Sequence, residues 1–277
     1  MPRFAANLSM MYPDLPFLER FEAAAKDGFK AVEYLFPYAF PAQELAARLK
    51  ANGLQQVLFN APPGGTDTES FAKAWETGQR GTASVPGRET EFRTGFAQAL
   101  VYADALNCPH IHAMVGLRAE GANAEAADTT LVSNLRWASA EATKAGRDVL
   151  IEPINTRSVP GFHLNRQDHA HRIVQAVGAP NVKVQMDLFH CQIVEGDLSA
   201  KIAQYLPTGR VGHFQIAEVP HRHEPGTGEV NWTHIFQTID RVSAECGWDG
   251  WIGCEYNPAD ASAGGTSRGL GWARPYL

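Results

Sequence analysis

Strand-like and helix-like segments alternate along the whole chain, and this alternation constrains the fold more than any other feature. Apolar β-patterns fall at eight places, residues 3–7, 31–36, 55–60, 110–115, 149–155, 182–190, 211–218 and 251–257. Regular βα alternation predicts parallel strands joined by crossover helices, and eight such units over roughly 250 residues match a (β/α)8 TIM barrel. A doubly wound sheet has the same alternation, but no GxGxxG follows the first strand. We therefore predict a single TIM-barrel domain over residues 1–277.

The helix-like segments lie between these strands. Their apolar residues recur at helical spacing, and they cover residues 17–28, 42–53, 91–107, 131–146, 167–178 and 232–247. One of them follows Pro41 and stops at Gly53, and another stops at Gly28. Proline before a helix and glycine after it are typical of helix ends.

Two connections are too long for plain turns. Residues 61–90, rich in Gly and Pro, follow the third strand, and residues 219–230 follow the seventh. Both leave the carboxyl ends of strands, where barrel enzymes build their sites from loops. We expect lids or substrate clamps; plain surface loops are the alternative.

Composition argues against several kinds of partner. The formal net charge is −6 and no dense run of Lys and Arg is present, so a nucleic-acid partner is not expected. No apolar stretch reaches about 18 residues and the first residues lack the layout of a signal peptide, so no membrane partner is expected. The four cysteines form no CxxC pair, which is typical of reduced, buried thiols and indicates a cytoplasmic protein.

A side chain able to bind a cation stands near the end of each of the last four strand-like runs. These residues are Glu152, Asp187, Gln215 and Glu255. An ionised carboxylate buried among Val, Ile and Leu is unfavourable unless a cation compensates it. Neighbouring parallel strands lie about 4.8 Å apart, so the four groups are predicted to close around one metal ion. This all-oxygen set suits Mg²⁺ or Mn²⁺, with Co²⁺ as a further candidate.

Such a centre suits proton transfer. A metal that holds a hydroxyl and a carbonyl oxygen acidifies the C–H between them and stabilises an enediolate. Glu152 and Glu255 would approach from opposite sides, one to remove the proton and the other to return it to the neighbouring carbon. We therefore predict these two glutamates as catalytic residues. For Asp187 alone, a helix N-cap is an equally good interpretation.

Several other polar residues are candidates for substrate binding. His190, three residues after Asp187, fits a substrate contact, the metal shell or a plain helix start. His221 and Arg222 in the seventh-strand loop, and Arg80 in the insertion, would suit an anionic substrate. A solvated loop is the alternative for each. His213 is interpreted as a packed barrel residue.

The motifs IEPIN, MDLFH, HFQIAE, HEPGTGEVN and GCEYNP resemble those of the hydroxypyruvate isomerase family, as do FAANLSMMY and VPGRETEFR. This family includes the 2-oxotetronate isomerases and belongs to the xylose-isomerase-like barrels. The resemblance runs from Phe4 to about Gly271, nearly the whole chain.

The resemblance also implies roles for particular residues. The family's catalytic glutamates fall on Glu152 and Glu255, and its remaining metal positions fall on Asp187 and Gln215. The related ketose 3-epimerases have a histidine at this last position. They also carry an acidic residue shortly after the fifth-strand motif, where this chain has Thr156, Arg157 and Ser158. These departures favour an acidic substrate over a free ketohexose.

The leading interpretation is a metal-dependent aldose–ketose isomerase that interconverts hydroxypyruvate and tartronate semialdehyde through a cis-enediolate. A 2-oxotetronate isomerase is the near alternative, followed by a ketose 3-epimerase. A metal-dependent hydrolase such as an apurinic endonuclease and a barrel that only binds a metabolite are the remaining alternatives. The expected partner is a small anionic hydroxy-oxo acid, and assembly into a homo-oligomer is left open.

Overall fold

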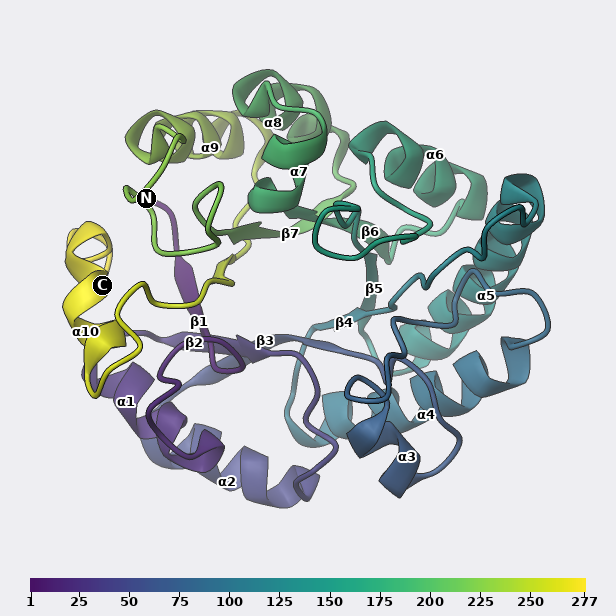
Figure 1. Cartoon of the computed structure of the whole chain (residues 1–277), viewed down its shortest axis with the longest axis horizontal. Coiled ribbons are helices and arrows are strands. Elements are labelled where there is room, and N and C mark those ends of the chain that lie inside the picture. The colour runs from purple at the N-terminus through teal and green to yellow at the C-terminus, as the bar shows by residue number, and fades with distance from the viewer.

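A computed structural model describes all of residues 1–277 and forms a closed parallel barrel. Neighbouring strands follow chain order, and β1 closes the barrel by pairing with β8. Figure 1 shows the strands at the centre, ringed by helices. The strands are β1 (Phe4–Asn7), β2 (Ala31–Tyr34), β3 (Gln55–Asn60), β4 (His110–His112), β5 (Asp148–Ile151), β6 (Val182–Asp187), β7 (Val211–Ile216) and β8 (Ile252–Cys254). The predicted TIM barrel is confirmed and the doubly wound sheet is excluded.

All six predicted helical segments are helices, and further short helices occur in the loops. The helices are α1 (Arg20–Lys26), α2 (Ala42–Asn52), α3 (Thr68–Lys73), α4 (Glu89–Ala105), α5 (Ala124–Lys144), α6 (Gln167–Val177), α7 (Leu188–Val194), α8 (Leu198–Tyr205), α9 (Trp232–Cys246) and α10 (Gly265–Gly269). Short 3₁₀ turns lie at Phe17–Glu19, Leu206–Thr208 and Leu270–Trp272. Gly53 ends α2 in the left-handed conformation, with φ 63°, as its sequence position predicts.

The last four strands are shorter than the apolar runs that predict them. β5 ends at Ile151 and β8 at Cys254, so Glu152 and Glu255 are the first residues beyond their strands. β6 ends at Asp187, where α7 begins, so the end of that apolar run is helix rather than strand. The acidic residues consequently stand on the carboxyl-end rim of the barrel.

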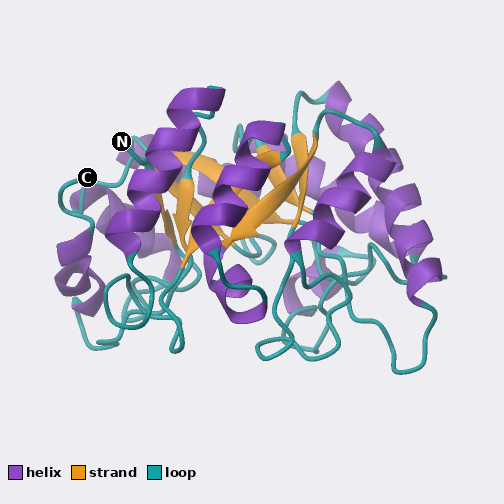
Figure 2. Ribbon diagram, turned by 90° about the horizontal axis from the view of Figure 1, so that it is seen from above, coloured by secondary structure: helices purple, strands orange, loops and turns teal.

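Long loops cover this rim. Residues 61–88 connect β3 to α4 and contain α3, and residues 217–231 connect β7 to α9. Figure 2 shows the long loops gathered on one side of the barrel, away from the N-terminus. The site face is therefore built from loops, as in other TIM barrels.

The interior consists mainly of one hydrophobic cluster of 68 buried residues. All four cysteines are free thiols; Cys108, Cys191 and Cys254 are buried as predicted, whereas Cys246 at the end of α9 is exposed. The helices of the structure include none that is both long enough and apolar enough to cross a membrane.

Candidate active site

A cavity of about 140 Å³ opens at the carboxyl ends of the strands. Its lining combines polar groups able to do chemistry with apolar side chains. Its lining residues are Met10, Leu35, Asn60, Trp75, His112, Met114, Glu152, Ile154, Ser158, Val159, His190, Arg222 and Glu255. Most of the side chains predicted to act on a substrate therefore share one cavity.

Three predicted carboxylates and a histidine converge at this rim, and all of them except Asp187 line the cavity. One ligand atom from each of Glu152, Asp187, His190 and Glu255 lies within 4.8 Å of every other. None of the four residues is more than 4% exposed. The barrel brings them together because each follows or ends a strand on the same rim.

Asp187 has both of the roles that the sequence suggests. Its Oδ1 accepts a hydrogen bond of 2.7 Å from the backbone N–H of Phe189 and so caps α7. Its Oδ2 is buried without a hydrogen-bond partner and belongs to the carboxylate cluster. One carboxylate therefore both starts a helix and contributes to the site.

Burial and nearby negative charges raise the pKa values of the two glutamates. Burial raises the pKa of Glu255 to about 8, although the Arg222 guanidinium opposes the rise. Burial also raises the pKa of Glu152 well above its ordinary value, and the negative charge of Glu255 adds to this rise. A carboxyl group that ionises near neutral pH can both accept and return a proton.

The orientation of His190 is fixed by Asn155. The backbone N–H of Asn155 points at His190 Nδ1 at 3.4 Å, and its side-chain nitrogen lies 2.5 Å from the same atom. A backbone N–H only donates, so Nδ1 accepts and the ring proton is on Nε2. That Nε2 faces Asp187 Oδ2 at 3.4 Å and Glu152 Oε1 at 3.6 Å. His190 is thus prepared to donate a hydrogen bond into the cavity.

Arg222 is the single cationic side chain among the carboxylates. Its Nη2 forms an ion pair with Glu255 and lies 3.6 Å from Asp187 Oδ2. Its side chain is 21% exposed, so one edge of the guanidinium reaches the cavity. A guanidinium in this position can bind a substrate carboxylate.

Gln215 lies below the cluster and is oriented by Glu33 on β2, a residue that the sequence analysis missed. The buried Glu33 carboxylate accepts from Gln215 Nε2 at 2.7 Å and from Asn7 Nδ2 at 2.9 Å, and its other oxygen lies 2.7 Å from His213 Nε2. Because an ionised carboxylate only accepts, the Gln215 oxygen must face away from it. There it accepts from Gln185 Nε2 at 2.5 Å.

Glu33 could have been found from its surroundings in the sequence. A lone carboxylate inside the apolar run AVEYLF needs a buried partner. The structure also shows why residue 253 is glycine, since a Cβ there would lie 2.2 Å from Glu33 Oε2. His213 is therefore a hydrogen-bonded partner of Glu33, which corrects its interpretation as plain packing.

The donor set fits a divalent cation. Glu152 Oε1 and Asp187 Oδ2 are buried oxygens without hydrogen-bond partners, which is unfavourable unless a cation compensates them. Together with Glu255 they form a carboxylate group of the kind that Mg²⁺ and Mn²⁺ prefer. Gln215 Oε1 keeps one lone pair beyond its bond to Gln185.

Two predicted substrate residues are not brought to the cavity. His221 is exposed and does not line it. The Arg80 guanidinium lies over the Trp75 ring, 3.8 Å from its centroid, and donates to the carbonyls of Trp75 and Gln79. Arg80 therefore touches the site through Trp75, which does line the cavity.

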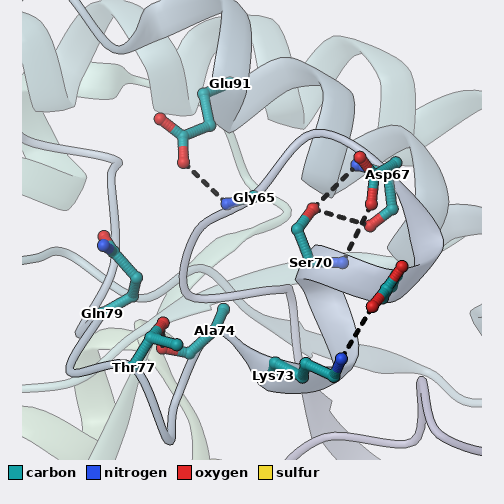
Figure 3. Close-up of a pocket in the computed structure, with 9 residues that line it drawn as sticks. Gly65, Asp67, Ser70, Lys73, Ala74, Thr77, Gln79 and Glu91 are labelled. Carbon is teal, nitrogen blue, oxygen red and sulfur yellow. Dashed lines mark hydrogen bonds and ion pairs between the residues drawn. The ribbon is translucent and has the colours of Figure 1, made fainter.

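A separate cavity of about 480 Å³ lies within the β3–α4 insertion (Figure 3). Its polar groups are largely paired with one another. Asp67 and Ser70 form a capping box, Lys73 binds Glu69, and Glu91 accepts from the backbone of Gly65. These contacts hold the insertion together and leave no convergent set of free groups.

Comparison with known proteins places this fold and site in a family. Residues 21–276 match the family model described as xylose isomerase-like TIM barrel. The chain therefore belongs to the xylose isomerase-like TIM barrel family. A crystal structure described as AP endonuclease, family 2, from Brucella melitensis has 46% sequence identity and a TM-score of 0.90, and covers 100% of this chain and 99% of that one.

Relatives narrow the assignment further. A 2-oxo-tetronate isomerase from Cupriavidus necator is 52% identical over 277 residues, with 100% of this chain and 99% of that protein covered. Hydroxypyruvate isomerase from Escherichia coli is 42% identical over 276 residues, with 100% of both covered. Within its family the chain is an isomerase of the hydroxypyruvate isomerase-like group.

Proposed function

We propose that the chain moves the carbonyl group of a small hydroxy-oxo acid to the neighbouring carbon, with a divalent metal ion and with Glu152 and Glu255 as acid and base. 2-Oxo-tetronate is the preferred substrate and hydroxypyruvate the second choice. This order reverses the expectation from the sequence. It rests on relatives named 2-oxo-tetronate isomerase at 52% and 44% identity, against 42% for the hydroxypyruvate isomerase of E. coli.

One observation carries the proposal: two buried glutamates with raised pKa values face the same small cavity from the ends of different strands. An isomerisation needs one group to take a proton from carbon and one to return it to the adjacent carbon. A barrel that only binds a metabolite needs neither. The cavity volume of about 140 Å³ is close to that of an engineered cavity of about 150 Å³ that holds benzene, so a three- or four-carbon acid fits.

The proposed steps use residues already described. A divalent ion held by Glu152, Asp187, Gln215 and Glu255 would polarise the substrate's carbonyl and hydroxyl oxygens. Arg222 binds the substrate carboxylate, and His190 donates its Nε2–H to a substrate oxygen. One glutamate removes the proton from C3, and the electron pair forms the C2–C3 double bond of the enediolate as charge develops on O2. The hydroxyl proton of O3 passes to O2, and a glutamate protonates C2 as the carbonyl forms at C3. Trp75 and Met10 exclude water from the cavity.

The test is a substrate comparison on the chelator-treated protein, with Mg²⁺, Mn²⁺ or Co²⁺ added back. We expect metal-dependent conversion of 2-oxo-tetronate with a higher kcat/KM than for hydroxypyruvate. Turnover of a ketohexose but of neither acid would contradict the proposal. Cleavage of abasic DNA would also contradict the proposal. It is included as a control because the similar B. melitensis structure is described as an AP endonuclease.

A further inference from the structure

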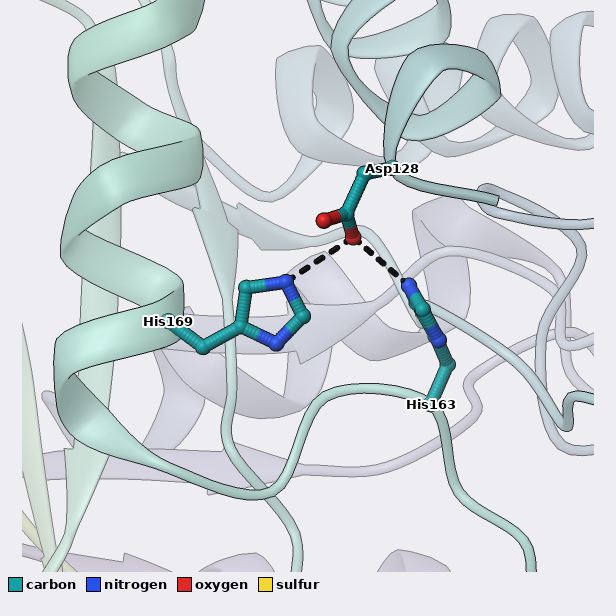
Figure 4. A group of neighbouring side chains, drawn as sticks. All are labelled: Asp128, His163 and His169. Atoms are coloured by element: carbon teal, nitrogen blue, oxygen red, sulfur yellow. Dashed lines mark hydrogen bonds and ion pairs between the residues drawn. The ribbon is translucent and has the colours of Figure 1, made fainter. Parts of the chain in front are cut away.

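A second group of metal-binding side chains lies outside the cavity. Asp128 of α5, His163 of the β5–α6 loop and His169 of α6 point toward one another (Figure 4). His163 Nε2 lies 2.7 Å and His169 Nε2 lies 2.8 Å from the same oxygen, Asp128 Oδ1. One ligand atom from each residue lies within 4.8 Å of the other two.

We propose that Asp128, His163 and His169 bind a borderline divalent transition-metal ion, for which Zn²⁺ is the reference. Two imidazole nitrogens and one carboxylate oxygen are a common protein set for zinc, with a remaining position for water. Mg²⁺ prefers oxygen ligands and would not compete well at this set. The two clusters of the molecule therefore differ in the class of ion that they favour.

The degree of burial suits an open site. The side chain of His163 is 2% exposed, that of His169 19% and that of Asp128 37%. A groove of about 500 Å³ between α5 and α6 is lined by Asp128 and His169. An ion can therefore enter from solvent and keep a water ligand, while the buried ring of His163 holds the inner side.

The charges around the three residues also fit. Asp128 forms no ion pair with Arg or Lys; its partners are the two histidines. The arginines that line the groove are engaged elsewhere, since Arg172 binds Asp168 and Arg136 donates to backbone carbonyls of α6. Burial lowers the pKa of His163, although the Asp128 carboxylate opposes this shift, and the neutral imidazole is the form that binds a metal.

An ion here would connect the active-site loop to the helices outside the barrel. His163 lies in the β5–α6 loop, which begins with Glu152 and contains Asn155, the partner of His190. Near His163 the loop is bound by a bridge between Leu117 and Phe162 and by a backbone hydrogen bond from Ile154 to Leu164. Metal binding at His163 would add a further link to α5 and α6.

The test measures bound Zn²⁺ by elemental analysis after equilibrium dialysis of the full-length protein. The variants are His169→Gln, Asp187→Asn and the double variant. Glutamine at 169 can still donate to Asp128, so His169→Gln keeps a hydrogen bond but replaces an imidazole by an amide, which is a poorer ligand for Zn²⁺. Asp187→Asn weakens the active-site cluster alone. His234→Gln, an exposed histidine on α9 outside both clusters, is the matched control.

We expect His169→Gln to bind one Zn²⁺ fewer than its parent in both backgrounds, and His234→Gln to match the wild type. Added Zn²⁺ should also raise the melting temperature of Asp187→Asn, by about 5 °C at a hundredfold excess over Kd, but not that of the double variant. Equal Zn²⁺ in wild type and His169→Gln would overturn the proposal. It would leave the three side chains as a hydrogen-bonded group, whatever the outcome for the isomerase reaction.

Discussion

Glu255 lines the cavity and contacts Arg222. Burial and the negative charge of Asp187 raise its pKa, and the positive charge of Arg222 lowers it. Replacing Glu255 by glutamine keeps the size of the side chain and one oxygen, but the amide cannot ionise and so cannot act as an acid or a base. We predict that Glu255→Gln lowers kcat by about 10²–10⁴-fold, the usual contribution of a general acid or base, without lowering the melting temperature. Glu245→Gln, on the exposed end of α9, is the control. Activity within tenfold of wild type would contradict the two-glutamate mechanism.

The same raised pKa values predict how metal binding responds to pH. Since burial raises the pKa of Glu255 to about 8, the group is mostly protonated below that pH, and an ion must displace the proton. Apparent Mn²⁺ affinity should therefore rise between about pH 6 and about pH 8, with proton release on binding. Calorimetry in two buffers of different ionisation enthalpy measures both quantities. A Mn²⁺ affinity that is constant over this pH range, with no proton release, would contradict the prediction that the ion displaces a proton from Glu255.

Glu33 is the residue on which the centre of the barrel depends. Its carboxylate accepts hydrogen bonds from the side chains of Asn7, His213 and Gln215. In Glu33→Gln an amide NH₂ would face these donors, and the unpaired groups should lower the free energy of unfolding by about 1–3 kcal/mol. Urea denaturation at unchanged m-value measures this. A variant as stable as wild type would show that the network adds no stability.

The residues that could be predicted from sequence are those whose position follows from strand ends. Glu152, Asp187 and Glu255 each lie at the end of an apolar run, and parallel strands bring such ends to one rim. The partners of Glu33 and Asn155 could not be predicted, because His213 and His190 lie far from them along the chain.

At the scale of elements, the β7–α9 loop is organised around one buried carboxylate. Glu218 accepts from the backbone N–H groups of Val219, Gly226 and Val230 and from Trp232 Nε1. Its own backbone carbonyl accepts from the N–H of Arg222. Hydrogen bonds to a side chain of the loop itself therefore hold the conformation of the loop that carries Arg222.

We predict that Glu218→Gln, which keeps only one accepting oxygen, raises KM roughly tenfold. The free energy of unfolding should fall by about 1–3 kcal/mol. Glu229→Gln in the same loop is a matched control, because Glu229 is exposed. Steady-state kinetics on the preferred acid separates KM from kcat. If Glu218→Gln and Glu229→Gln have the same KM, Glu218 does not position Arg222.

The loops also mark where prediction from sequence fails. Periodicity locates α2 and α6 closely, yet it does not show that Arg80 stacks on Trp75 or that His221 faces solvent. Loop conformation depends on single side-chain contacts such as those of Glu218, which no repeat in the sequence reveals. The same holds for α7, which begins within an apolar run that resembles a strand.

At the scale of the whole molecule, the barrel was predicted from the βα alternation, the eight strand-like runs and the absence of a GxGxxG motif. The strand order of the structure confirms it. The barrel places β5 to β8 side by side, so four consecutive strands carry the proposed metal and proton-transfer groups on neighbouring parts of one rim. Assembly into a homo-oligomer and a cytoplasmic location stay predictions.

The central claim is that protons pass between carbon and the two glutamates, and proton NMR in deuterated water tests it most directly. With 2-oxo-tetronate and Mg²⁺ or Mn²⁺, we predict that the product carries solvent deuterium at C2. The signal should be lost on chelation and in Glu255→Gln. Product formed without any solvent deuterium, under conditions where the glutamate proton exchanges, would point to direct hydride transfer and contradict the account.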